Sequence, residues 1–94
     1  MNSIVNQRGF RREYLPTPRT YYERALSITA GRSGWRTVRC PFHNDKHASL
    51  SVHLDHGGFR CHACGAKGGD VLAFHMLRHG LGFKAAAKEL GAWV

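Results

Sequence analysis

The sequence lacks an apolar run long enough to cross a membrane. A transmembrane helix needs about 18 or more consecutive apolar residues, and the 94-residue sequence contains no such run. The first 16 residues, MNSIVNQRGFRREYLP, also lack the apolar segment of a secretory signal peptide. We therefore expect a protein without membrane association that works in a cytoplasm, where cysteines stay reduced.

Acidic residues are scarce. Six Asp and Glu residues stand against 14 Lys and Arg residues, which gives a formal net charge of +8 with neutral histidines. Enzymes that use magnesium for phosphoryl chemistry need clustered carboxylates, and the acids of this chain are scattered, so we expect no such catalysis from this chain alone. The basic excess favours a polyanionic partner, and its plainer interpretation is a solvated basic surface.

Cysteine is scarce too, but its placement is informative. The three cysteines form Cys40-x2-His43 and Cys61-x2-Cys64, and these four side chains make a complete tetrahedral shell for one structural Zn²⁺. An odd number of cysteines disfavours a disulfide framework. A Cys–His nucleophile pair would leave two cysteines unexplained, and histidine is a minority ligand of iron–sulfur clusters. His47 is a weaker ligand candidate because Cys-x2-His makes the tighter turn.

The chain is long enough for one small domain. We expect residues 1–16 to be a flexible basic tail and residues 17–94 to form a single zinc-binding domain. The core-forming part is so small that it needs a disulfide or a structural metal for stability. A structural zinc contributes about 10–16 kcal/mol of apparent binding energy to folding.

Local signals predict helices beside a small sheet, an α+β fold. Thr17 and Pro18 open a helix that we expect to end at Gly31. Residues 35–39 predict a short strand, and residues 49–54 and 59–62 predict a hairpin around the turn at 55–58. Asp70 caps a helix over 71–79, and a last helix follows Gly82 and closes at Gly91.

The predicted hairpin has two unlike faces. Leu50, Val52 and Leu54 alternate with polar residues, so they should face the core. The opposite face gathers donors for phosphate and flat rings for bases: Ser49, Ser51, His53, Arg60 and His62. The alternative is an ordinary solvated sheet face.

A second histidine pair lies outside this pattern. His75 and His79 are four residues apart on the predicted helix over 71–79. No acid or cysteine joins them in the sequence, so we expect no second metal there.

The combined motif resembles the zinc-binding domain of bacterial and phage DNA primases. The residues that carry the resemblance are Cys40-Pro41-Phe42-His43, Lys46, Ser49, Cys61-x2-Cys64-Gly65, Gly68-Gly69-Asp70-Val71 and Gly82-Phe83. The resemblance covers about residues 20–91. It implies a zinc ribbon, a small antiparallel sheet with flanking helices, in which Cys40, His43, Cys61 and Cys64 are the metal ligands.

The resemblance also implies a function and a source. We expect a non-catalytic single-stranded DNA template-binding subunit of a primase or replication system, encoded by a bacterium, phage or mobile element. A separate primase catalytic subunit or a replicative helicase would be its partner. The candidate DNA contacts are Arg39, Lys46, Ser49, Ser51, His53, Arg60, His62 and Lys67.

Two other roles compete with this one. The alternative is a zinc-ribbon adaptor or inhibitor that acts on a replicative helicase or polymerase. A duplex-binding regulator is disfavoured because no helix is rich in Arg, Asn or Gln.

Overall fold

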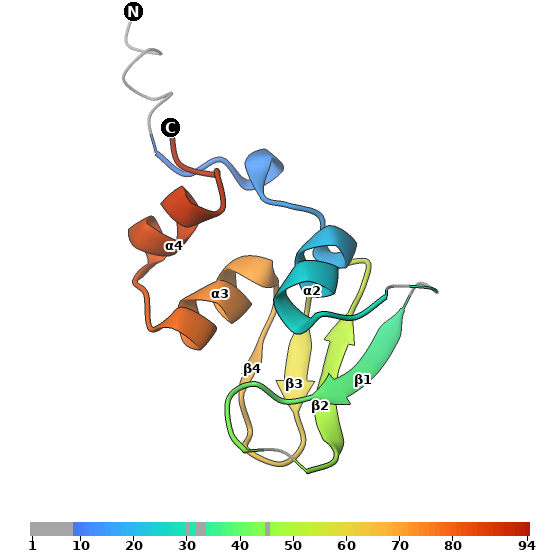
Figure 1. Ribbon diagram of the computed structural model, residues 1–94. Helices are drawn as coiled ribbons and strands as arrows, with labels where there is room; N and C mark the ends of the chain where they lie inside the picture. Colours follow the sequence, from blue (N-terminus) through green and yellow to red (C-terminus); the bar gives the residue numbers. More distant parts are fainter. Residues whose placement is uncertain (1–8, 30, 32–33, 45) are drawn as a thin grey trace, which may run out of the picture.

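A four-stranded antiparallel sheet organises the molecule (Figure 1). The computed structural model describes residues 9–29, 31, 34–44 and 46–94. The strands, in spatial as well as sequence order, are β1 (Trp35–Arg39), β2 (Ala48–His53), β3 (Phe59–Cys61) and β4 (Lys67–Gly68). The helices are α2 (Pro18–Leu26), α3 (Val71–His79) and α4 (Phe83–Glu89), preceded by the short 3-10 helix η1 (Arg12–Tyr14). The α+β class with flanking helices is confirmed.

The hairpin of β2 and β3 has the register that the alternation predicts. Leu50 pairs with Cys61 and Val52 with Phe59, and all four side chains are buried. Ser51 pairs with Arg60, and both point to the opposite face. The strands differ from the prediction by one residue at their ends, and the edge strand β4 was not predicted because two residues show no alternation.

Aromatic rings fill the space between the sheet and the helices. Phe74 of α3 lies at the centre of this cluster, with its ring centroid 5.1–5.8 Å from those of four neighbours, namely Tyr21, Tyr22, Phe42 and Phe59. The buried hydroxyl of Tyr22 donates to the carbonyl of Gly57 at 2.6 Å, which satisfies its polar atom. The cluster therefore ties α2, α3 and β3 to the loop after β1.

Helix caps follow the sequence signals, with one exception. The Asp70 carboxylate accepts from the amide of Ala73 at 2.8 Å, and α3 has the predicted bounds. Helix α2, however, ends at Leu26 rather than near Gly31, because Ser27 adopts a left-handed conformation with φ of 52°. The amide of Ile28 then donates to the carbonyl of Glu23, and Ile28 packs against the core after the helix has ended.

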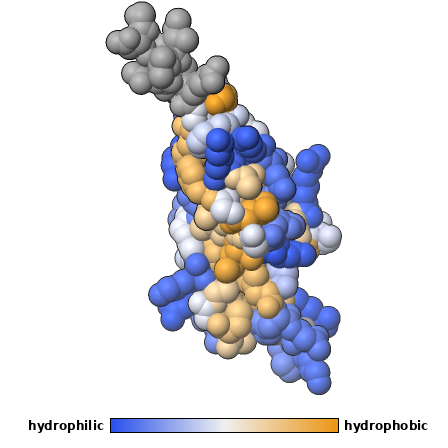
Figure 2. Space-filling view, turned by 90° about the vertical axis from the view of Figure 1, so that its left-hand side faces the viewer, coloured by the Kyte–Doolittle hydropathy of each residue, from blue (hydrophilic) through white to orange (hydrophobic). Residues whose placement is uncertain are grey.

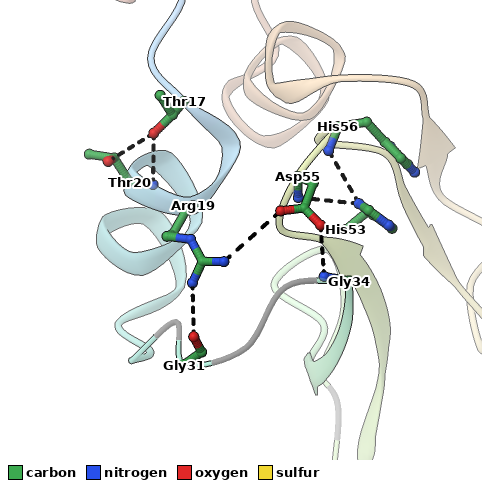
Figure 3. Close-up of polar contacts among 8 residues, drawn as sticks. All are labelled: Thr17, Arg19, Thr20, Gly31, Gly34, His53, Asp55 and His56. Carbon is green, nitrogen blue, oxygen red and sulfur yellow. Dashed lines mark hydrogen bonds and ion pairs between the residues drawn. The ribbon is translucent and has the colours of Figure 1, made fainter.

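The turn between β2 and β3 is fastened by side chains (Figure 3). The His53 Nδ1 accepts from the amides of Asp55 and His56, each at 3.2 Å. The Asp55 carboxylate accepts from the amide of Gly34 at 3.0 Å and lies 4.0 Å from the guanidinium of Arg19. The turn is thus held to the start of β1 and to α2.

The segment before α2 is more ordered than predicted. Gly9 and Val94 exchange backbone hydrogen bonds, and Phe10 forms a bridge with Trp93, so residues 9–11 run beside the end of the chain (Figure 1). Residues 1–8 of the tail predicted for residues 1–16 lie outside the described residues. The apolar partners of this segment are spread over the C-terminal region, which explains why no periodicity revealed it.

Helix α4 packs on α3 through Ala86, Ala87 and Leu72. An apolar band crosses the side of the molecule that Figure 2 presents, the side of α3 and α4. Leu77 and Phe83 are about half exposed, so part of this apolar surface meets solvent. None of the helices in the described part of the chain has the length and apolar character needed to cross a membrane.

Candidate functional site

The four predicted ligands converge at one end of the sheet. Cys40 follows β1 and His43 lies in the next loop, while Cys61 ends β3 and Cys64 lies in the turn before β4. Their ligand atoms all lie within 4.8 Å of one another. Among the residues that the structure describes, this is the only set of three or more His, Cys, Asp or Glu side chains that meets this spacing.

The distances fit a tetrahedral zinc site. The Cys40 and Cys64 sulfurs lie 3.9 Å apart, and the Cys61 sulfur lies 3.5 Å from Nε2 of His43. A tetrahedron with Zn–S bonds of about 2.3 Å and Zn–N bonds of about 2.0–2.1 Å requires separations of about 3.8 Å and 3.6 Å. The donor set and its spacing therefore suit zinc, and all four positions of the shell are supplied by the protein.

Hydrogen bonds orient the Cys61 sulfur. It accepts from the amides of Cys64 at 3.3 Å and Ala63 at 3.4 Å, and the Ser49 hydroxyl lies 3.5 Å away. Burial by itself raises the pKa of this thiol, but these bonds and the one to His43 outweigh it and lower the pKa to about 5. Cys61 is therefore prepared as a thiolate, the form that binds a metal.

The pKa of the Cys40 thiol shifts in the opposite direction. Burial raises the pKa of its thiol to about 12, the Phe42 amide opposes this, and the neighbouring Cys61 and Cys64 add to the increase. Several thiolates this close repel one another in the absence of a cation. A divalent ion in their midst removes that repulsion, which is the electrostatic reason for the cluster to hold one.

Local backbone geometry shapes both ligand pairs. Gly65, the residue after the last ligand, has a φ of 80°, and its amide donates to the carbonyl of Cys61 at 3.0 Å. In the other pair, Phe42 stands between Cys40 and His43 in the sequence, and its ring packs on Phe59 and Phe74. The core thus fixes the loop that carries His43.

The outer face of the sheet carries a polar row beside this site. The cross-strand register aligns Thr37, Ser51, Arg60 and Lys67 across the four strands. Arg60 and Lys67 are exposed, and His62 bonds to Ser51 with Nε2 3.3 Å from the hydroxyl oxygen. The structure therefore brings together four of the candidate DNA contacts, Ser51, Arg60, His62 and Lys67, and their contact with DNA stays a prediction.

Four other candidate contacts are placed differently from this row. The Ser49 hydroxyl lies against the Cys61 sulfur, so it belongs to the metal centre. The His53 Nδ1 is engaged in the turn after β2. Arg39 ends β1 beyond a register shift, and Lys46 lies exposed in the metal-binding loop.

Trp35 is a surface residue that the sequence pattern did not reveal. Its side chain is 59% exposed at the start of β1, where it pairs with His53. Its ring meets those of His53 and His56 edge to face at 5.0 and 5.6 Å, and these two imidazoles stack at 3.6 Å. The alternation of residues 35–39 was the available signal, but the face of Trp35 depends on the pairing of β1 with β2.

Two shallow hollows flank Arg60 on this face. One of about 280 Å³ is lined by Trp35, Ser51, Arg60 and His62. The other, of about 530 Å³, lies between Trp35 and the edge strand, where Lys67, Gly68 and Gly69 line it. An exposed indole and two cations therefore border concave surface.

Comparison with known proteins finds one matching family and several similar proteins. Residues 27–94 match the family described as CHC2 zinc finger, the zinc ribbon of DnaG-type primases. The DNA primase of Mycobacterium tuberculosis strain H37Rv is 57% identical over 35 residues, which are 37% of this chain and 5% of that protein. The DNA primase of Geobacillus stearothermophilus is 45% identical over 53 residues, 56% of this chain and 9% of that protein.

A phage protein is also similar. Gene 58 protein of Mycobacterium phage D29 is 44% identical over 45 residues, 48% of this chain and 33% of that protein. The chain thus spans a third or less of the length of these three relatives. Because the family match covers most of the sequence and includes all four residues of the Cys–His cluster, this chain belongs to the CHC2 zinc finger family of primase zinc ribbons.

Proposed function

We propose that this chain is a zinc-dependent module that binds the single-stranded DNA template in a primase or replication system, without catalysis of its own. One Zn²⁺ held by Cys40, His43, Cys61 and Cys64 would fix the ends of β1 and β3 and thereby the sheet. The observation that carries the proposal is the exposed Trp35 beside Arg60 and Lys67 on the sheet face that the register defines.

The chemistry of this face suits a single strand. Arg60 and Lys67 have no carboxylate partner in the described part of the chain, so both are free to neutralise phosphates. An indole that is more than half exposed offers a stacking surface to any base. Ser51 and His62 add hydrogen-bonding groups next to it. A duplex would keep its bases stacked and out of reach of Trp35.

Fluorescence anisotropy with labelled single- and double-stranded oligonucleotides tests the proposal. We expect the zinc-loaded protein to prefer the single strand. Trp35→Ala should weaken that binding by about 1–3 kcal/mol, which is roughly 5- to 150-fold in Kd. Lys88→Glu on α4 is the control for surface charge. No binding at low salt, or equal binding by Trp35→Ala, would refute the proposal.

A second candidate function is supported by an apolar groove along α3. Ala73, Met76, Leu77 and Leu81 line an apolar groove of about 360 Å³, with Lys67 at its border. Such a surface fits an adaptor that docks on a replicative helicase or polymerase. Arg60→Glu discriminates between the roles, because it should abolish DNA binding and leave docking intact, whereas Leu77→Asp should do the reverse.

A further inference from the structure

His75 of α3 makes two short hydrogen bonds far from the Cys–His cluster. Its Nδ1 lies 2.8 Å from the hydroxyl of Tyr21 on α2, and its Nε2 lies 2.7 Å from Oε1 of Glu89 on α4. The imidazole is only 12% exposed, whereas the Glu89 side chain is 55% exposed. One ring therefore joins three helices, and its solvent-side nitrogen already has a carboxylate in front of it.

His79 completes a potential set of three ligands. It lies one helical turn after His75, and the two ring centroids are 4.5 Å apart. No acid or cysteine joins this histidine pair in the local sequence, but an acid joins it in the structure. Glu89 reaches His75 from the next helix, 14 residues later, which local sequence spacing does not reveal.

We propose that His75, His79 and Glu89 form a second site for a divalent transition ion such as Zn²⁺, Ni²⁺ or Co²⁺. Two imidazoles and one carboxylate are a ligand set that such ions accept, with a further position open to water. A hollow of about 380 Å³ borders all three side chains and provides that space. Exposed His79 and Glu89 leave a path for the ion to enter.

Binding requires two small rearrangements. The ion takes the place of the proton between His75 and Glu89, so the His75 proton moves to Nδ1 and is donated to the Tyr21 oxygen. Metal-binding histidines commonly hold their other nitrogen in this way. His79 must also rotate about its exposed side-chain bonds, because His75, His79 and Glu89 do not yet have the mutual ligand spacing of the Cys–His cluster.

Nearby cations limit the affinity of this site. Arg24 lines the same hollow, and Arg78 lies close enough to affect Tyr21. Their repulsion makes the second ion weaker and more exchangeable than one held by three thiolates. It also predicts that removal of the Arg24 charge tightens binding, a result that adventitious metal binding elsewhere would not give.

Cobalt titration of the zinc-loaded protein tests the proposal. Co²⁺ bound by nitrogen and oxygen has visible absorption without the thiolate charge-transfer band, so exchange at the cysteines is detected separately. We expect one additional equivalent of Co²⁺. His79→Ala and Glu89→Gln should each weaken it at least about tenfold, and so should Tyr21→Phe, which removes the partner of Nδ1. Arg24→Gln should strengthen it, and Lys88→Gln, the matched control on α4, should leave it unchanged.

Circular dichroism checks that each variant keeps its fold, which we expect for His79→Ala and Glu89→Gln because both side chains are exposed. If the zinc-loaded native chain binds no Co²⁺ beyond exchange at the cysteines, so that the total metal content stays at one ion per chain, the proposal is overturned. A second equivalent that survives both His79→Ala and Glu89→Gln would overturn it as well, and its loss in His56→Ala would place the ion at the stacked His53–His56 pair.

Discussion

The ring of Phe42 lies 5.1 Å from the ring of Phe74, although Phe42 belongs to the metal-binding loop and Phe74 to α3. Phe42 stands between the ligands Cys40 and His43 in the sequence. A shift of its ring is therefore transmitted through the backbone to the first ligand pair. The aromatic core and the metal centre are therefore one cooperative structure rather than two.

Replacement of Phe42 by Ala should destabilise the zinc-loaded protein by about 2 kcal/mol, less than for a fully buried phenylalanine because the ring is only partly buried. Chemical denaturation measures this change. Phe83→Ala is the matched control, because Phe83 is 44% exposed and contacts Phe10 at the other end of the molecule. Equal losses for the two variants would contradict the coupling of loop and core.

Two adjacent glycines should differ sharply in their tolerance of alanine. A Cβ at Gly68 would lie 2.6 Å from the Phe59 ring and 2.8 Å from the Ala73 side chain, both well packed. Such overpacking destabilises by about 1–3 kcal/mol. A Cβ at Gly69 meets nothing within 4 Å, so Gly69→Ala should be neutral or slightly stabilising. Thermal unfolding of both variants decides the matter, and a reversed order would show that β4 does not pack on α3 as described.

The salt dependence of DNA binding should report the number of phosphate contacts. Arg60→Gln and Lys67→Gln should each reduce the slope of log K against log salt by about 0.7. Lys88→Gln should leave the slope unchanged. Anisotropy titrations at several salt concentrations give these slopes. Unaltered slopes in both sheet variants would mean that the strand follows a different surface.

Alkaline pH should destabilise the fold through its tyrosines. Burial raises the pKa of Tyr21 to about 12, with Arg78 opposing and Glu89 adding, and burial raises the pKa of Tyr22 well above its usual value near 10. The folded state thus favours the neutral phenols. The stability that the two buried phenols give to the fold is complete below pH 10, where they are neutral in both the folded and the unfolded protein. It decreases as the pH rises toward 12 and above.

Phenolate absorbance measured alongside circular dichroism checks this expectation. Tyr21 and Tyr22, both buried, should ionise together with unfolding. Ionisation of Tyr21 and Tyr22 with the ordinary tyrosine pKa, while the circular dichroism of the folded protein is unchanged, would contradict the described burial.

Short-range patterns predicted most of the fold. Alternation at Leu50 and Val52 fixed the buried face of the hairpin, and Asp70 and Gly80 fixed the ends of α3. The metal ligands were likewise predictable because each pair is local in sequence. These features depend on residues within a few positions of one another, where steric and hydrogen-bonding rules act directly.

Features that depend on distant partners were missed. The outward face of Trp35 requires the pairing of β1 with β2, and the order of residues 9–11 requires the C-terminal segment. Ser27 ends α2 because Ile28 turns into a core that the local sequence does not describe. Glu89 meets His75 only after two helices have packed. None of these contacts leaves a periodic signal in the sequence.

Elemental analysis of native protein after dialysis against metal-free buffer, compared with Cys64→Ser, tests the central claim most directly. The account predicts one firmly held zinc per native chain and a large loss of zinc in the variant, with unfolding of residues 35–70 when a strong chelator removes the ion. Native protein without stoichiometric transition metal, or a circular dichroism spectrum unchanged by excess chelator, would contradict it.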